Sequence, residues 1–249
     1  MNVIENPKAE SFYKDSLKLL KDSGIPFMVG GTFAVNAYIG IQRPTKDMDI
    51  FCKAADSGKI LQFFSGHDYK TQMTDERWLA KVYKGRYFFD IVFNSIIAVM
   101  PVTEEWFAES QTAKIYDLAV KVLPPTELIW SKAFVQSRYK YDGNDIVHTI
   151  LIKNKIINWK RLFSYMDHHW EVLLDHLLRF RFIYPSEREV IPKWLLDELF
   201  ERLINQMNLP TSKEKICRGR LLALSDFEVD VKEWGYTDLI GWNEKNDKK

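Results

Sequence analysis

The sequence predicts an α+β fold, in which a mixed N-terminal part precedes an all-helical C-terminal part. Three observations support this. Short apolar stretches with strand character lie only before Pro124-Pro125, a glycine-containing turn joins two of them, and helical patterns fill almost all of the chain beyond the two prolines. The 249 residues, 46% of them hydrophobic, suffice for one large domain or two modest ones. We therefore predict an N-terminal domain over 1–123 and a helical domain over 124–249.

The elements of the N-terminal part follow in a simple order. Gly24 is expected to end the first helix, a turn containing Gly85 is typical of a hairpin, and Thr103 is expected to cap an acidic first turn. The predicted helices cover 8–23, 32–40, 57–65 and 103–110, and the predicted strands are PFMV, DMDIFCK, WLAKVY, RYFFDIVF and AKIYDLAVKVL.

The C-terminal part is expected to contain four longer helical stretches. Thr126 is the expected cap of the first of them. The predicted stretches are TELIWSKAFVQSR, NDIVHTILIK, residues 159–182 and KWLLDELFERLINQM.

Composition excludes several classes of function. With 35 basic and 34 acidic residues the chain has no overall charge that would draw it to a DNA groove or a membrane, although this balance is compatible with a local basic groove. Cys52 and Cys217 are too few and too isolated for a disulfide framework or a thiolate metal site, which favours reduced thiols in the cytoplasm. The N-terminus lacks a signal-peptide core, and IIAVM is too short to span a bilayer. We expect a cytoplasmic protein with no membrane partner.

Two aspartates one residue apart form the first candidate site. Residues two apart on a strand point to the same face, so Asp47 and Asp49 should project together while Met48 and Ile50 turn to the core. Two carboxylates this close repel each other unless a cation lies between them, and a hard divalent ion such as Mg²⁺ suits oxygen ligands. For an isolated D-x-D motif, an exposed strand end remains the more common explanation.

A Gly-Gly pair precedes these aspartates at a predicted strand-to-helix turn. Gly30 and Gly31 would let backbone N–H groups approach an anion closely, and the N-terminus of the following helix favours phosphate. Turns of this kind are often purely structural, so the pair alone is a weak signal.

Asp90 joins the two motifs into one hypothesis. It lies in the middle of the apolar strand YFFDIVF, where a carboxylate needs a partner or a cation to offset its desolvation. A hydrogen-bonded structural aspartate is the alternative. Three carboxylates and a glycine turn together predict a site for a metal–polyphosphate complex.

This arrangement resembles the nucleotidyltransferase superfamily that includes DNA polymerase β and the CCA-adding enzymes. It is most similar to the bacterial branch of abortive-infection-type toxins and small-substrate, antibiotic-modifying nucleotidyltransferases. The resemblance covers roughly 26–93 and implies a mixed β-sheet flanked by helices. The positions that match are Gly30, Gly31, Ala34, Gly40, Arg43, Thr45, Asp47 and Asp49.

The resemblance implies a Mg²⁺-dependent transfer of NMP from ATP or another NTP to a hydroxyl, with release of pyrophosphate. Two Mg²⁺ ions, with Mn²⁺ as an alternative, would be held by Asp47 and Asp49 and by a second site shared with Asp90. The acceptor would be tRNA or another RNA, a protein or a small molecule, and a toxin–antitoxin-like setting is one implied context.

The resemblance also implies how the nucleotide is bound. Gly30, Gly31 and Thr32 would cradle the β- and γ-phosphates, and Arg43 would reach the triphosphate unless it is an ordinary loop arginine. The C-terminal segment PPTELIWSKAFVQSRYKYDGNDIVHTIL resembles the helical region of the same branch only loosely. There Lys132 would contact a phosphate, with a solvated charge as the alternative. Asp145 would be a family position or merely an early helix acid that favours the dipole.

Other functions are weighed against this one. A catalytically inert relative that binds nucleotide or a partner protein is the main alternative, although all three carboxylates are intact. A kinase-like enzyme is disfavoured because no Walker lysine follows the glycines and no kinase catalytic loop occurs. The histidines at 148, 168, 169 and 176 do not have zinc-site spacing, since 169 and 176 lie about two helical turns apart.

Overall fold

The computed structural model describes residues 6–94 and 100–238. The chain forms two compact units. The N-terminal unit contains the residues up to Ser131 together with Ile152–Ile157, and the C-terminal unit contains Lys132–Leu151 and the residues from Asn158 onward. The domain division at 123/124 stays a prediction.

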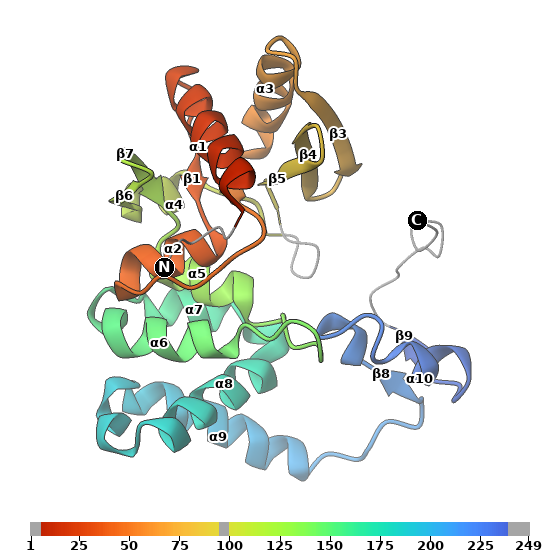
Figure 1. The fold of residues 1–249 in the computed structure, drawn as a ribbon. Coiled ribbons are helices and arrows are strands. Elements are labelled where there is room, and N and C mark those ends of the chain that lie inside the picture. Colours follow the sequence, from red (N-terminus) through yellow and green to blue (C-terminus); the bar gives the residue numbers. More distant parts are fainter. Residues whose placement is uncertain (1–5, 95–99, 239–249) are drawn as a thin grey trace. The chain divides into compact units, whose positions relative to one another are not determined.

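A seven-stranded mixed sheet forms the centre of the N-terminal unit, in the order β3-β4-β5-β2-β1-β7-β6 (Figure 1). β2 pairs in parallel with β5, and β1 pairs in parallel with β7, whereas the other four neighbouring pairs are antiparallel. The strands are β1 Met28–Val29, β2 Asp49–Phe51, β3 Lys70–Asp75, β4 Leu79–Lys84, β5 Tyr87–Val92, β6 Gln111–Ile115 and β7 Leu118–Val122. The predicted mixed sheet flanked by helices is therefore confirmed.

Helices flank this sheet as predicted. α1 contacts β5, α2 contacts β6, and α3 packs against β3 and β4 (Figure 1). The helices are α1 Pro7–Asp22, α2 Gly31–Ile39, α3 Ala54–Ser65, α4 Glu104–Glu109 and α5 Pro125–Lys132. Thr103 precedes α4 without a capping hydrogen bond from its side chain. Thr126 was wrongly expected to cap α5, because the helix begins one residue earlier at Pro125, whose fixed φ suits a first helical position.

Aromatic side chains join α1 and α3 to the sheet. The Phe89 ring of β5 lies with its centroid 5.1 Å from that of Phe64 on α3 and 6.1 Å from that of Phe12 on α1. Phe64 is fully buried and Phe89 is 1% exposed. Since Phe89 and Asp90 are consecutive on a strand, this packing directs Asp90 to the opposite face of the sheet.

We expect Phe64→Ala to destabilise the protein by about 3–5 kcal/mol, because it leaves a cavity in this aromatic core. Phe63→Ala, at the neighbouring partly exposed position, should cost much less. Urea unfolding of both variants measures the difference, and equal losses would contradict the packing described for Phe64.

Both hairpins of the sheet turn through residues with positive φ. Gly85, at φ +61°, lies between β4 and β5 as predicted. AKIYDLAVKVL was expected to be one extended segment, but it folds back on itself as β6 and β7. Tyr116 and Asp117, at φ +48° and +66°, form that turn. The sequence hid the turn because tyrosine, unlike glycine or asparagine, is uncommon at such positions.

The C-terminal unit is built mainly from helices. α8 packs against α9, and the short strands β8 and β9 pair in parallel (Figure 1). The elements are α6 Gly143–Lys153, whose last two residues belong to the N-terminal unit, α7 Trp159–Tyr165, α8 Trp170–Ile183, α9 Lys193–Met207, α10 Glu228–Lys232, β8 Ile216–Cys217 and β9 Thr237–Asp238. Single-turn 3₁₀ helices span Asp167–His169 and Gly219–Leu221, and a longer one spans Pro185–Val190. A further single-turn 3₁₀ helix, Asn154–Ile156, belongs to the N-terminal unit.

The predicted helical stretch over 159–182 is broken in the structure. α7 ends at Tyr165, and a 3₁₀ turn over Asp167–His169 separates it from α8. Arg202 of α9 fixes this break, because its Nη1 lies 2.8 Å from the Asp167 carboxylate and 3.4 Å from the Asp167 carbonyl oxygen. A tertiary contact of this kind has no local sequence signal.

Two expectations from composition can be compared with the structure. Within residues 6–94 and 100–238, no helix is both long enough and apolar enough to cross a bilayer. Cys52 and Cys217 are buried free thiols.

Candidate active site

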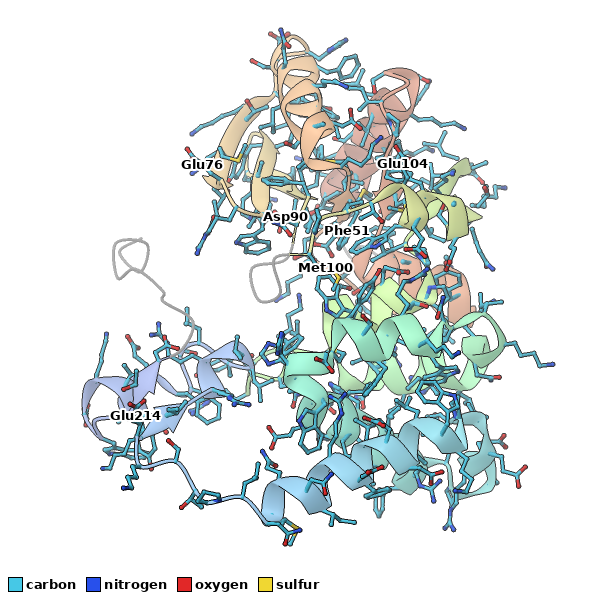
Figure 2. All side chains as sticks on the ribbon, turned by 180° about the vertical axis from the view of Figure 1, so that it is seen from behind. Phe51, Glu76, Asp90, Met100, Glu104 and Glu214 are labelled. Atoms are coloured by element: carbon cyan, nitrogen blue, oxygen red, sulfur yellow. The ribbon has the colours of Figure 1, made fainter. Side chains whose placement is uncertain are left out.

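Asp49 and Asp90 lie side by side on the two central parallel strands. They are register partners of β2 and β5, followed by the pair Ile50 and Ile91. The two isoleucines are buried at 1% and 0% exposure, so the two aspartates share the other face of the sheet. Figure 2 shows Asp90 on β5 and Phe51 on the neighbouring β2. Asp90 therefore belongs to the same part of the molecule as the D-x-D motif.

Asp47 precedes β2 and continues its alternation. Met48 and Ile50 are each 1% exposed, whereas Asp47 and Asp49 are partly exposed. The predicted division of this segment into a core face and a carboxylate face is confirmed. The hydroxyl of Thr45 lies 3.2 Å from Asp47 Oδ1, which orients this carboxylate.

The Gly-Gly turn is in direct contact with the D-x-D motif. The N–H of Gly30 donates a 2.9 Å hydrogen bond to the carbonyl oxygen of Asp49. A Cβ on Gly31, which has φ +54°, would lie 1.9 Å from Asp49 Oδ2, and a Cβ on Gly30 would lie 2.3 Å from the Phe51 ring. Only glycine fits either position. The first turn of α2, which includes Thr32, thus begins against the Asp49 carboxylate.

The loop between α2 and β2 is held by side chains that the sequence did not identify. Asn36 on α2 forms two 3.0 Å hydrogen bonds with the backbone of Arg43, one through each end of its amide. The Tyr13 hydroxyl donates a 2.8 Å hydrogen bond to the Lys46 carbonyl oxygen. The sequence did offer a clue to this role, because asparagine is unfavourable inside an apolar helix unless its side chain forms hydrogen bonds elsewhere. Arg43 itself is partly exposed.

Tyr13 reports on the electrostatics of the site. Burial raises the pKa of its hydroxyl most, and the charges of Asp47 and Asp90 raise it further. The charge of Asp49 adds to the same increase. All three carboxylates therefore act on one phenol, which stays protonated at neutral pH and keeps its hydrogen bond to the loop.

The donor set suits a hard divalent cation, but Asp90 already has a partner. Lys81 Nζ lies 2.5 Å from Asp90 Oδ1, and the two side chains are 21% and 16% exposed. In the part of the chain that the structure describes, no three acidic, histidine or cysteine side chains are grouped closely enough to enclose a metal ion. The carboxylates are thus gathered on one face without forming a closed metal cage, and the predicted metal site stays a prediction.

Lys132 and Asp145 form a separate cluster in the C-terminal unit. Lys132 is only 5% exposed, and its ammonium lies 2.9 Å from Asp142 and 2.8 Å from Asp145. Burial acts most strongly and lowers the pKa of Lys132, but the charges of both aspartates and their hydrogen bonds outweigh it and raise the pKa overall. Lys132 is therefore not a solvated charge. Binding a phosphate would require it to give up an ion pair, and that role stays a prediction.

We expect Lys132→Met to destabilise the protein by about 3–5 kcal/mol, because it leaves the buried carboxylate of Asp145 and the partly buried one of Asp142 without their cation. Lys193→Met is the matched control. It breaks an ion pair with Asp197 whose side chains are 86% and 59% exposed, and such pairs contribute at most about 1 kcal/mol. Chemical denaturation of both variants tests this, and a small loss for Lys132→Met would show that the cluster does not hold the unit together.

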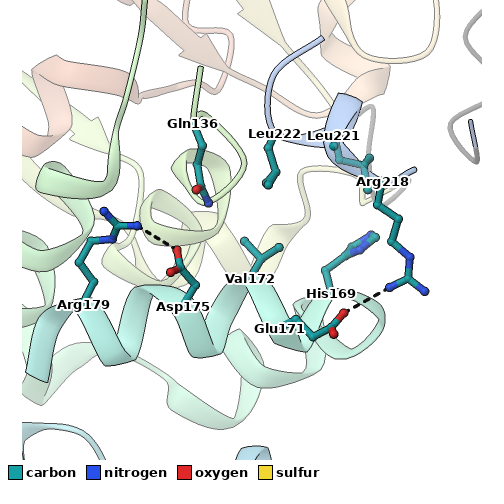
Figure 3. A pocket seen from close by; sticks show the side chains of 10 residues that line it. Gln136, His169, Glu171, Val172, Asp175, Arg179, Arg218, Leu221 and Leu222 are labelled. Carbon is teal, nitrogen blue, oxygen red and sulfur yellow. Dashed lines mark hydrogen bonds and ion pairs between the residues drawn. The ribbon is translucent and has the colours of Figure 1, made fainter. Parts of the chain in front are cut away.

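A pocket of about 420 Å³ lies within the C-terminal unit (Figure 3). Arg179 pairs with Asp175 at 3.3 Å, and Arg218 pairs with Glu171 at 3.5 Å. Burial, followed by the charges of Arg218 and His168, lowers the pKa of the lining residue His169. The lining residues are Gln136, His169, Glu171, Val172, Asp175, Arg179, Arg218, Gly219, Leu221 and Leu222, and none of them was predicted as a site residue.

Several solved structures resemble the chain at low sequence identity. A lincosamide antibiotic adenylyltransferase, LnuA, bound to lincomycin is 18% identical, with a TM-score of 0.43 over 59% of this chain and 98% of that one. The antibiotic-resistance factor ANT(2'')-Ia is 15% identical, with a TM-score of 0.46 over 68% and 96% of the two chains. A putative nucleotidyltransferase from Thermotoga maritima is 14% identical, with a TM-score of 0.40 over 51% and 83%. No curated protein is similar in sequence to this chain.

A family model matches about two thirds of the chain. The model described as "Nucleotidyl transferase of unknown function (DUF2204)" matches residues 10–173, which include the glycine turn, the D-x-D motif and Asp90. The chain therefore belongs to this family of nucleotidyl transferases.

Proposed function

We propose that the protein transfers NMP from a nucleoside triphosphate to a hydroxyl acceptor and releases pyrophosphate, using Mg²⁺. One observation carries the proposal. Asp49 contacts the Gly31 turn on one side and is paired in register with Asp90 on the other. The glycine turn and two of the carboxylates therefore lie next to each other, which supports a site for a metal–triphosphate complex.

The residues of the glycine turn and of the following loop bind the triphosphate in this proposal. The backbone of Gly30, Gly31 and Thr32 binds the β- and γ-phosphates at the N-terminus of α2, where the helix dipole favours anions. Arg43 contributes a positive charge from the loop that Asn36 holds in place.

The carboxylates would hold the divalent ions. Asp47 and Asp49 would bind the first Mg²⁺, and Asp90 would share a second, with Mn²⁺ as an alternative. When bound, such ions offset the negative charge that develops on the phosphates and favour loss of the acceptor proton. In the balanced reaction the acceptor oxygen bonds to the α-phosphorus, the bond from that phosphorus to the bridging oxygen of the β-phosphate breaks, pyrophosphate leaves, and the hydroxyl proton passes to water.

Transfer can be measured without knowing the acceptor. Wild-type protein is incubated with each α-labelled NTP, Mg²⁺ and separate pools of RNA, protein and small molecules, beside Asp47→Asn/Asp49→Asn. The proposal expects label in one pool and stoichiometric pyrophosphate with the wild type only. A nucleoside diphosphate in place of pyrophosphate would indicate γ-phosphoryl transfer instead. No labelling and no pyrophosphate from any pool would contradict the proposal.

The second candidate is an inert relative that binds nucleotide or a partner protein. One observation favours it, since Lys81 already neutralises Asp90. The two candidates differ in outcome, because an inert relative would bind NTP without releasing pyrophosphate in any pool.

A further inference from the structure

Lys81 is positioned on Asp90 by the register of the β4–β5 hairpin. The two residues are direct partners of the antiparallel pair, so their side chains lie on the same face. Nζ of Lys81 lies 2.5 Å from Oδ1 of Asp90. Both side chains are largely buried, which leaves the ion pair poorly screened by water.

A second contact holds the Lys81 ammonium in place. It lies 4.2 Å from the ring centroid of Phe88, two residues before Asp90 on β5. Since residues two apart share a strand face, the Phe88 ring and the Asp90 carboxylate together bind one cation, the Lys81 ammonium. Oδ1 of Asp90 is therefore already in contact with a cation, and a divalent ion bound through this oxygen would have to displace it.

Asp47 has a different kind of partner. Its carboxylate accepts a 3.2 Å hydrogen bond from the neutral hydroxyl of Thr45. A divalent ion at Asp47 and Asp49 therefore does not have to displace an ammonium from Asp47. An ion at Asp90 would meet the Lys81 ammonium at close range, and like charges repel strongly in a partly buried site.

We propose that Lys81 is a positioning residue that competes with the second divalent ion for Asp90. In the absence of nucleotide, Lys81 keeps this ion out, and only the Asp47–Asp49 site fills. The triphosphate of a bound NTP attracts the ammonium away from Asp90 and so opens the second position. This inference rests on the proposed function, because it requires metal binding at these carboxylates.

Mn²⁺ binding to the full chain without nucleotide tests the inference, followed by calorimetry and by the electron paramagnetic resonance of free Mn²⁺. Wild type is expected to bind one ion, and Asp49→Asn is expected to abolish that binding. Lys81→Met should gain a second ion, with affinity at Asp90 raised by about 10- to 100-fold, the range over which neighbouring groups change metal affinity. Lys81→Met/Asp90→Asn should return to one ion.

Two further variants make the test specific. Lys84→Met is the matched control, because Lys84 is on the same strand and its ammonium lies 4.4 Å from the Tyr69 ring centroid. It should bind Mn²⁺ like the wild type. Lys81→Gln removes the charge but keeps a hydrogen-bond donor for Asp90, and it replaces Lys81→Met if that variant melts at a lower temperature or fails to fold.

The outcomes separate this inference from the proposed function. One ion bound equally by the wild type and both Lys81 variants would overturn the competition but not the metal-dependent function. Two ions in the wild type without nucleotide would also overturn it. If the wild type binds no Mn²⁺ ion, or binds only ions that Asp49→Asn still binds, both the competition at Asp90 and the metal-dependent function are overturned.

Discussion

Asp49→Asn is expected to lower the rate of NMP transfer by about a thousandfold, because a bound metal contributes several kcal/mol of transition-state stabilisation. Asparagine has the shape of aspartate but lacks its charge. The β2–β5 pairing, which uses the backbone, should therefore persist. Pyrophosphate release under saturating Mg²⁺ measures the effect.

The control for this variant is Asp68→Asn. Asp68 is exposed and has φ +62°, a conformation that asparagine also tolerates. It should retain wild-type rates, and both variants should melt at nearly the wild-type temperature. Full activity of a folded Asp49→Asn protein would show that the D-x-D motif does not take part in the chemistry.

Gly31→Ala is expected to remove most activity and to destabilise the fold. The added Cβ would lie 1.9 Å from Asp49 Oδ2, so the carboxylate must move, and a displacement of about 1 Å in an active site can cost about 100-fold in rate. The left-handed conformation at φ +54° adds about 1–2 kcal/mol of backbone strain for alanine. Activity assays and denaturant unfolding separate the two effects.

Gly24→Ala isolates the backbone strain. Gly24 has φ +70°, but a Cβ there would meet nothing within 4 Å. This variant should therefore lose the same 1–2 kcal/mol of stability and keep its rate. Equal rates for the two alanine variants would mean that the contact between Gly31 and Asp49 has no role in catalysis.

The local patterns of the site could be predicted from the sequence. The alternation of Asp47, Met48, Asp49 and Ile50 between two faces follows from the geometry of an extended chain. The strand-to-helix turn at Gly30 follows from its place between the apolar strand PFMV and the helical pattern over 32–40. Asp90 stood out because a carboxylate in an apolar strand needs a partner.

The long-range pairings could not be predicted in the same way. The parallel pairing of Asp49 with Asp90 joins strands about forty residues apart, and no local pattern sets that register. The hydrogen bond from Tyr13 to Lys46 depends on how α1 packs, which no local pattern of the sequence sets.

Lys81 was not predicted as a site residue, although its position next to Asp90 follows from the hairpin. The turn at Gly85 was predicted, and a two-residue turn over 85–86 fixes the antiparallel register, which pairs Lys81 with Asp90. The pairing of Lys81 with Asp90 could therefore have been predicted from the sequence by counting back from the turn along both strands. The turn at Tyr116 gave a weaker signal, since tyrosine is atypical for positive φ although the following Asp117 is not.

The most direct test of the central claim is a crystal structure with Mn²⁺ and an NTP analogue that cannot be cleaved between the α- and β-phosphates. We expect an anomalous Mn²⁺ peak between the carboxylates of Asp47 and Asp49, with the β- and γ-phosphates against the backbone N–H groups of residues 30–32. Nucleotide bound elsewhere in the chain, with no Mn²⁺ at these two aspartates, would contradict the account.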